Sequence, residues 1–133
     1  AMEMAFIGNK ALHRKRTYAL SDLCEHELLT FQRGSQPHVH LVNVFNEAGT
    51  WPKRIHTISS ISAMAQLVQG GFGIATLPLQ AVRNSMSFPN LKPLKSAVVL
   101  QPLPIHASYR VDPTSREVEL LVASAAAFVG TFK

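Results

Sequence analysis

The sequence predicts an α/β domain in which helices flank a mixed, mostly parallel sheet. Three apolar segments of strand length, 27–31, 54–58 and 72–77, alternate with two segments, 36–48 and 60–69, whose apolar residues recur at helical spacing. The succession strand, helix, strand, helix, strand is typical of a parallel sheet with helices on its faces. With 133 residues, the chain has the length of one domain of ordinary size.

The N-terminal part is expected to begin with a short strand at Met4–Ile7. A basic loop follows as far as Arg16, and Ser21 is expected to cap a single helical turn. The apolar run Glu27–Phe31 then has the length of a strand, and it ends in a polar turn, Gln32–Ser35, that contains a glycine. This order places a strand directly before the start of the first long helix.

Both central helices are expected to begin after polar cap residues and to end at glycines. Ser35 is a natural N-cap for the first, and Gly49 is suited to a left-handed helix stop. Ser59 and Ser60 are cap candidates for the second. The glycine-rich segment 70–73 follows a helix and precedes a strand, which is the reverse of a phosphate-binding turn, so we interpret its glycines as helix stop and close packing.

The C-terminal part is expected to complete the sheet and to add a long helix. Short strands are predicted near 91–94 and 98–100, a longer strand at 104–110, and a turn at Asp112–Pro113. The last helix has the clearest amphipathic pattern of the chain. Its apolar face comprises Val118, Leu121, Val122, Ala125, Phe128 and Val129.

Composition places the chain among globular proteins. Hydrophobic residues make up 47% of the chain and charged residues 16%, which argues against disorder. No apolar run reaches the roughly 18 residues that span a bilayer, so we predict no membrane segment. The N-terminus lacks the pattern of a secretory signal, and a single cysteine, Cys24, fits a reducing compartment. We therefore expect a cytoplasmic protein.

The net charge of +5 raises the question of nucleic acid. The basic residues are spread along the chain except for one cluster, Lys10, Arg14, Lys15 and Arg16. Few aromatic residues accompany them, and no helix-turn-helix, RNA-binding or zinc-finger pattern is present in the sequence. We interpret the cluster as a solvated basic loop rather than as a nucleic-acid-binding surface.

The sequence predicts no catalytic site, no metal site and no cofactor. Among the six histidines, His38 and His40 are two residues apart on a predicted helix and point in different directions, and the others lack the spacing of a zinc site. No nucleophile with a base and no paired carboxylates are evident, so we expect no enzymatic activity. We interpret Cys24 as a small packed residue rather than as a reactive thiol.

Three motifs, in order along the chain, resemble the sensing domain of LysR-type bacterial transcription regulators. Leu20–Leu23 and His26–Leu29 look like the family's entry into its second subdomain. The strand at 103–110 followed by a long helix is similar to the family's end. Between them, the segment Ser59–Pro78 has Leu67-Val68, Gly71, Gly73-Ile74 and Leu77-Pro78 in the places of a family pattern.

This resemblance implies a two-lobed, periplasmic-binding-protein-like fold of type II. Residues 1–10 would form a strand that crosses between the lobes, and residues 11–103 would form the second lobe. Residues 104–133 would be a return strand and a C-terminal helix that belong to the first lobe. Most of the first lobe, and the DNA-binding domain that precedes it in the family, would be missing from this chain.

The resemblance also implies a function. The chain would be a non-catalytic sensor of a small-molecule effector in a homo-oligomeric regulator, which would reach DNA only through the missing N-terminal domain. The alternative is the solute-binding component of a transporter, which has the same architecture. An enzyme on a related fold is a third possibility, against which the lack of paired catalytic groups argues.

In the family, polar effector contacts lie at two turns that follow strands and lead into helices. Free N–H groups and the helix dipole attract anions at such helix N-termini, so a small carboxylate would fit between the two turns. Arg33 could pair with that carboxylate. The alternative is that the serines only cap their helices. The candidate ligand-binding residues are Thr30, Gln32, Arg33, Ser35, Thr57, Ser59 and Ser60.

The apolar face of the last helix needs a partner if the first lobe is missing. Leaving several such side chains in water would cost several kcal/mol at about 25 cal/mol per Å² of apolar area. We expect the helix either to fold back on the second lobe or to pair with another copy of the chain, and we favour the second arrangement.

Overall fold

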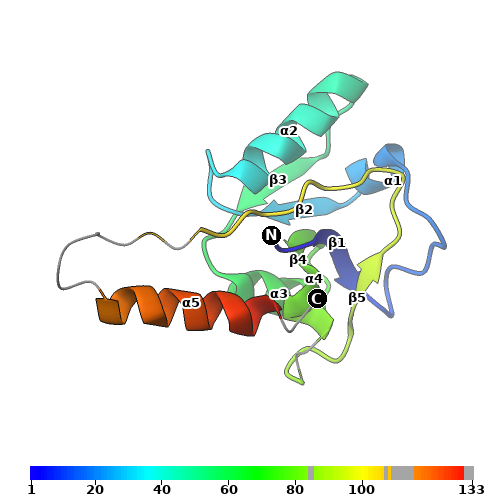
Figure 1. The fold of residues 1–133 in the computed structure, drawn as a ribbon. Coiled ribbons are helices and arrows are strands. Elements are labelled where there is room, and N and C mark those ends of the chain that lie inside the picture. Colours follow the sequence, from blue (N-terminus) through cyan, green and yellow to red (C-terminus); the bar gives the residue numbers. More distant parts are fainter. Residues whose placement is uncertain (84–85, 107, 109–115, 131–133) are drawn as a thin grey trace.

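The computed structural model describes residues 1–83, 86–106, 108 and 116–130. Its centre is a five-stranded sheet in the order β3-β2-β4-β1-β5 (Figure 1). The strands are β1 (Met4–Asn9), β2 (Glu27–Thr30), β3 (Arg54–Thr57), β4 (Ile74–Pro78) and β5 (Leu91–Leu94). The helices are α1 (Leu20–Cys24), α2 (Gln36–Ala48), α3 (Ile61–Gln69), α4 (Leu79–Arg83) and α5 (Arg116–Gly130). The predicted α/β class is confirmed.

The sheet is mixed. Strand β2 pairs in parallel with both β3 and β4, whereas β1 lies antiparallel between β4 and β5. The carboxyl ends of β2, β3 and β4 therefore meet at one edge, which we call the carboxyl edge, with the start of β1 beside it. Gly73 allows β4 to approach β2, because a Cβ atom there would lie 2.2 Å from the backbone oxygen of Glu27. Close packing is thus the role of this glycine.

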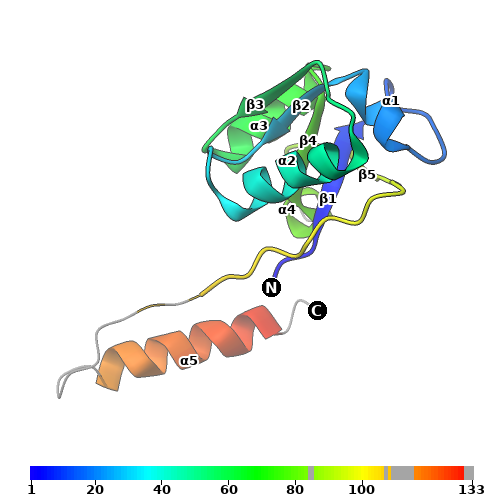
Figure 2. The same cartoon turned by 90° about the horizontal axis from the view of Figure 1, so that it is seen from above.

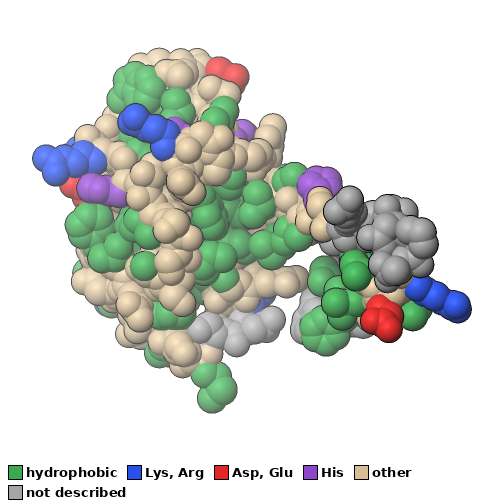
Figure 3. Space-filling view, turned by 90° about the vertical axis from the view of Figure 1, so that its left-hand side faces the viewer, with side chains coloured by type: hydrophobic (Ala, Val, Ile, Leu, Met, Phe, Trp, Pro, Cys, Tyr) green, Lys and Arg blue, Asp and Glu red, His purple; other side chains and the backbone are tan. Residues whose placement is uncertain are grey.

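Helix α5 stands apart from the sheet. Figure 2 shows it separated from α2 and the strands, and the space-filling view in Figure 3 shows open space between it and the rest of the molecule. None of its residues is buried. Its nearest neighbours are the chain start and Ile105, which border a groove of about 210 Å³ with Val122, Ala125, Ala126 and Val129.

The position of α5 excludes one of the two arrangements expected for its apolar face. The helix does not fold back on the sheet and the helices that cover it, so that alternative is wrong for the described residues: Leu121 is 69% exposed and Val129 59%. Pairing of the helix with another copy stays a prediction. None of the described helices has the length and hydropathy that crossing a bilayer requires.

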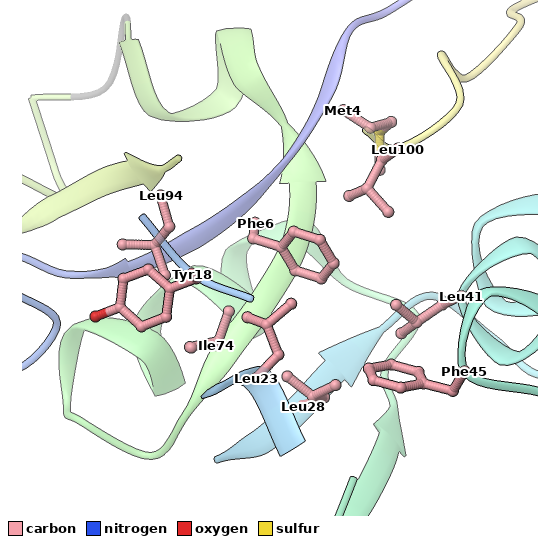
Figure 4. Close-up of a cluster of buried hydrophobic side chains, with 10 residues drawn as sticks. All are labelled: Met4, Phe6, Tyr18, Leu23, Leu28, Leu41, Phe45, Ile74, Leu94 and Leu100. Atoms are coloured by element: carbon pink, nitrogen blue, oxygen red, sulfur yellow. The ribbon is translucent and has the colours of Figure 1, made fainter. Parts of the chain in front are cut away.

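The two long helices of the body cover opposite faces of the sheet. Leu28 and Leu29 are adjacent in β2 and belong to different buried clusters, as the alternation of a strand requires. Figure 4 shows Leu41 and Phe45 of α2 directed toward the sheet on one face. The other face packs against α3. That second cluster comprises Ile7, Leu29, Met64, Ala65, Val68, Ala75, Leu77, Val82 and Leu91.

These buried side chains explain why the segments fold as they do. Leu41 and Phe45 are four residues apart, so they lie on one side of α2, and both are fully buried. Burying a side chain of this size stabilises the fold by about 1.5–3 kcal/mol. Helix α2 begins after Ser35 and ends at Gly49, whose φ of 67° is the left-handed conformation that the sequence predicts.

Three predictions for local structure are wrong. Ser21 does not cap α1: the N-cap residue is Ala19, whose N–H donates to the carboxylate of Asp22 at 2.9 Å. Residues 98–100 form no strand. Residues 104–106 and 108 form none either, and only Leu103 makes an isolated bridge, to Met2. The remainder of the predicted strand and the turn at Asp112–Pro113 lie outside the described residues.

Candidate functional site

The carboxyl edge of the sheet carries a row of three threonines. Thr30 is opposite Thr57 in the β2–β3 register, and its Oγ1 lies 2.8 Å from Oγ1 of Thr76 in β4. Thr30 and Thr76 are buried, whereas Thr57 is exposed. A hydroxyl group can donate one hydrogen bond and accept two, so this pair keeps hydrogen-bonding capacity beyond its mutual contact.

A small cavity of about 10 Å³ lies beside this threonine pair. Its size is close to the minimum for one water molecule. Its lining comes from β1, β4, the first turns of α2 and the chain near residue 100. The lining residues are Met4, Pro37, His40, Thr76, Leu100 and Gln101.

Two hydrogen bonds hold the chain near residue 100 against α2. The N–H of Gln101 donates to Nε2 of His40 at 3.3 Å, and Nε2 of Gln36 donates to the side-chain oxygen of Gln101 at 3.2 Å. Leu100 is buried, although it lies in no strand. The segment therefore closes one side of the cavity over the N-terminal turns of α2.

Two polar atoms at the start of α2 are buried without a hydrogen bond to any described residue. They are Oγ of Ser35 and Oε1 of Gln36. Ser35 is the N-cap residue of α2, yet its side chain makes no cap bond. A hydroxyl group can donate or accept a hydrogen bond, whereas an amide oxygen only accepts one. Together these two atoms can therefore bind a ligand's hydrogen-bond acceptor and its hydrogen-bond donor.

The electrostatic setting at the start of α2 favours a negative charge. The first turn of the helix has no acidic residue, and Arg33 lies exposed in the turn that precedes it. The helix dipole adds a positive partial charge at this end. His38 accepts a hydrogen bond at Nδ1 from the N–H of Gly34 at 3.2 Å, which holds the turn against the helix.

The structure brings the two predicted turns together. The N–H of Ile58, which follows β3, donates to the backbone oxygen of Thr30 at 2.9 Å. Around this contact lie the predicted site residues, in three settings. Thr30 is buried and bonded to Thr76; Ser35 is partly buried; Gln32, Arg33, Thr57, Ser59 and Ser60 are exposed.

The two serine caps differ. Oγ of Ser60 accepts a hydrogen bond from the N–H of Ala63 at 3.2 Å, so Ser60 caps α3. Ser35 makes no such bond. The interpretation of the serines as helix caps therefore holds for Ser60, while the side chain of Ser35 stays available to a ligand.

Sequence reasoning missed several residues of the cavity. Thr76 lies inside a strand predicted for its apolar character, and no local pattern marks it as a site residue. The spacing of His40 from the other histidines bears only on metal binding and does not indicate a contact with the cavity. Gln101 belongs to a segment without regular structure, so no periodicity could place it against α2. Among the described residues, no group of three or more His, Cys, Asp or Glu side chains could hold a metal ion.

A family model for the LysR substrate binding domain matches residues 2–129. The chain belongs to this family. The fold is accordingly that of a LysR substrate binding domain, which is like the type II periplasmic binding proteins. No curated protein matched the sequence.

Solved structures with the same fold come from LysR-type regulators and their sensing domains. The CcmR regulatory domain of Synechocystis PCC6803 in complex with 2-PG has a TM-score of 0.68 and 16% identity, over 92% of this chain and 62% of that one. The effector binding domain of QuiR in complex with shikimate has a TM-score of 0.61 and 19% identity, over 89% and 58%. Full-length CbnR complexed with its target DNA has a TM-score of 0.58 and 20% identity, over 74% and 35%.

The chain therefore spans less than two thirds of the length of each of these similar proteins. The structures named above are regulatory proteins or domains, which gives the transporter alternative no support. Figure 3 looks at the molecule from the left-hand side of Figure 1 and shows hydrophobic side chains across the middle of the body.

Proposed function

We propose that this chain is the effector-sensing part of a LysR-type transcription regulator and that it binds a small molecule without transforming it. Family membership supports the proposal, and so does the carboxyl edge, because ligands bind outside the carboxyl ends of strands in open α/β sheets. The whole regulator would be a homo-oligomer in the bacterial cytoplasm, with a separate N-terminal domain that binds DNA.

The observation that carries the proposal is two buried oxygens that have no hydrogen-bond partner among the described residues, Oγ of Ser35 and Oε1 of Gln36. A buried polar atom that lacks a hydrogen bond costs about 1–3 kcal/mol. Such a cost needs an explanation, and a ligand that supplies the missing bonds would offset it. The pair lies at a helix N-terminus beside a cavity, where a ligand's polar group can approach.

The effector class that fits best is a small anion that also carries a hydroxyl group, because a hydroxyl group can donate to Oε1 of Gln36 and an anionic oxygen cannot. The helix dipole, Arg33 and the lack of acidic residues in the first turn of α2 all favour negative charge. Arg33 can form two parallel hydrogen bonds to a carboxylate or a phosphate. Two similar domains were solved with 2-PG and with shikimate, a carboxylate. The predicted residues Gln32, Thr57 and Ser59 would then contact the ligand from the rim.

We also propose that the chain holds parts of two lobes. Residues 1–10 would cross between the lobes, residues 11–103 would form the second lobe, and residues 104–133 would return to the first. Met2 and Leu103 support this division, because they form an antiparallel bridge where both crossings would lie. The exposed apolar face of α5 would then pack on first-lobe strands.

Sensing would depend on how the lobes and subunits respond to the ligand. An effector can shift a regulator between two arrangements only by binding one of them more tightly. Here the first lobe would close over the start of α2 and the cavity that Gln101 borders. Closure would bury the ligand and alter the positions of α5 and the crossing segments. That movement would change the contacts between subunits.

Thermal unfolding of the chain with candidate anions tests the proposal. Shikimate, 2-PG and inorganic phosphate are added to the chain and to two variants, Ser35→Ala and Ser21→Ala. At least one anion should raise the melting temperature, by an amount set by its concentration relative to Kd. The increase should be reduced in Ser35→Ala and kept in Ser21→Ala, because Ser21 is exposed and lies far from the carboxyl edge.

The proposed site is wrong if an anion stabilises Ser35→Ala as much as the unchanged chain. The proposed effector class is wrong if none of the three anions raises the melting temperature of the unchanged chain. Turnover of any of these compounds, measured by NMR of the ligand, would contradict the non-catalytic function.

A further inference from the structure

A cluster of basic side chains lies at the other end of the sheet, where β1 leads into the loop 10–16. This loop lies against β5 and the residues around it. The N–H of Lys10 donates to the oxygen of Asn90, and the N–H of Tyr18 to the oxygen of Lys95, both at 2.8 Å. In the β1–β5 register Lys92 is opposite Gly8. We call the set the basic end: Lys10, Arg14, Lys15, Arg16, Lys92 and Lys95.

The basic end has an excess of positive charge. Residues 8–26 and 90–96 contain six of the chain's 13 Lys and Arg residues but only two of its eight acidic residues, so four of the five net positive charges lie here. Lys15 pairs with Asp22. No other lysine or arginine of the basic end forms an ion pair within the described part of the chain, and all except Lys92 are exposed.

The backbone that carries these cations is held in place. The N–H of Asn9 donates to Nδ1 of His13 at 3.0 Å, and the Asn9 side chain bonds to Ala11 N at 2.9 Å and to Gln69 O at 2.8 Å. His13 is buried. When a charged surface binds a partner, it loses less conformational entropy if its backbone is already ordered than if it lies on a flexible loop.

The sequence alone indicated a solvated loop, because it showed only the four cations between Lys10 and Arg16. The fold adds Lys92 and Lys95 from a segment about 80 residues away in the chain. Residues 10–16 and 90–96, all of them described, contain no aromatic side chain apart from the buried His13. The surface therefore has charge without the stacking platforms that single-stranded nucleic acids need.

We propose that the basic end binds the phosphate backbone of duplex DNA. Duplex DNA is the proposed partner because the similar full-length protein CbnR was solved in complex with its target DNA. In the whole regulator this contact would add to the one made by the separate N-terminal domain. Phosphate contacts of this kind position a protein on DNA without reading its sequence. The basic end lies at the opposite end of the parallel strands from the carboxyl edge, so DNA and effector can bind at the same time. This contact goes beyond effector sensing and does not depend on it.

Binding of the chain to a labelled random-sequence DNA duplex, over a range of salt concentrations, tests the proposal. The logarithm of the binding constant should fall linearly with the logarithm of the salt concentration, with a slope of about −0.9 for each neutralised phosphate. The combined variant Lys10→Gln, Arg16→Gln and Lys95→Gln should make the slope shallower by about 2.7, since three such contacts are lost.

A matched control removes positive charge elsewhere. Arg83→Gln and Arg116→Gln together alter exposed residues in α4 and at the start of α5, and should change the slope by less than about 1. The charge-matched variant of the basic end, Lys10→Gln with Lys95→Gln, should make the slope shallower by about 1.8. If the triple variant of the basic end fails to fold, the single change Lys95→Gln should still make the slope shallower by about 0.9.

Three results would overturn the proposal. One is equal weakening by the two charge-matched variants, which would mean that only net charge matters. Another is tighter binding to polyglutamate than to the duplex, which would indicate an acidic protein as the partner. The third is a lack of salt-dependent DNA binding by the unchanged chain.

Discussion

The hydroxyl groups of Thr30 and Thr76 bind each other across the neighbouring strands β2 and β4. Their oxygens lie 2.8 Å apart, and both residues are buried. One hydroxyl donates and the other accepts, so each satisfies a polar group that has lost its contact with water. The pair lies directly beside the cavity at the carboxyl edge and couples the ends of two strands there.

Breaking this pair should show strong coupling between the two threonines. Thr30→Val or Thr76→Val alone leaves one buried hydroxyl without its partner and should lower the free energy of unfolding by about 1–3 kcal/mol. The double variant should cost less than the sum of the single ones, because no orphaned hydroxyl remains. Urea unfolding of the four proteins measures this. Additive costs within about 0.5 kcal/mol would contradict the pairing.

The hydroxyl group of Ser60 should stabilise the fold, whereas that of Ser59 should contribute little. Ser60→Ala removes the bond to the N–H of Ala63 and should lower the free energy of unfolding by about 0.5–2 kcal/mol. Ser59→Ala, one residue earlier and also exposed, should change it by no more than about 0.5 kcal/mol. Chemical denaturation compares the two. An equal loss from both would show that the cap is wrongly assigned.

His13 should make the chain less stable in mild acid. Burial and the neighbouring imidazole of His26 lower the pKa of His13 below its ordinary value of 6.5, so the unfolded chain binds this proton more readily than the folded chain. The stability that neutral His13 supports is therefore complete above pH 6.5 and is lost as the pH falls from there through the lowered pKa. The positive charge of Lys92 also lowers this pKa.

The variant His13→Asn tests this dependence, because its side-chain oxygen can still accept from the N–H of Asn9. The free energy of unfolding, measured from just above pH 6.5 into mild acid, should fall less in His13→Asn than in the unchanged chain. His106→Asn is the control, since His106 is exposed and distant from this cluster. An identical pH dependence in all three proteins would exclude His13 as the cause.

The apolar face of α5 should make the isolated chain self-associate. Leu121 is 69% exposed and Val118 41%, and a helix face of this kind is stabilised when a second copy covers it. Sedimentation at micromolar concentration should show a dimer or a larger species. Leu121→Gln with Val118→Gln should give a monomer, and Leu120→Gln, which alters an exposed leucine off this face, should not. A monomeric unchanged chain would contradict this account of the helix.

The sequence predicted the parts of the fold that local pattern determines. Leu41 and Phe45 show helical spacing, Gly49 ends that helix, and the apolar run that contains Leu28 and Leu29 is a strand, because each depends only on residues close in the chain. The antiparallel placement of β1 between β4 and β5 depends on pairing across about 70–90 residues, and no local pattern contains it. The sheet is therefore less parallel than the succession of elements alone suggests.

The candidate site was predictable to a similar degree. The two turns were located from the ends of apolar runs, and the bond from Ile58 to Thr30 joins them. The residues that close the cavity were not located, since Gln101 reaches α2 from a segment with no periodicity. The strand expected at 98–100 failed for the same reason: Leu100 is buried by the core and not by a strand partner.

The central claim is that the start of α2 binds an effector, and NMR titration of the isotopically labelled chain tests it most directly. Increasing amounts of shikimate or 2-PG are added while the backbone amide signals are followed. We expect saturable shifts at Ser35, Gln36 and Gln101, together with the turn that follows β3, and no comparable shifts at Ser21 or Gly130. Saturable shifts confined to other parts of the chain, or no saturable shifts with any small anion, would contradict the account.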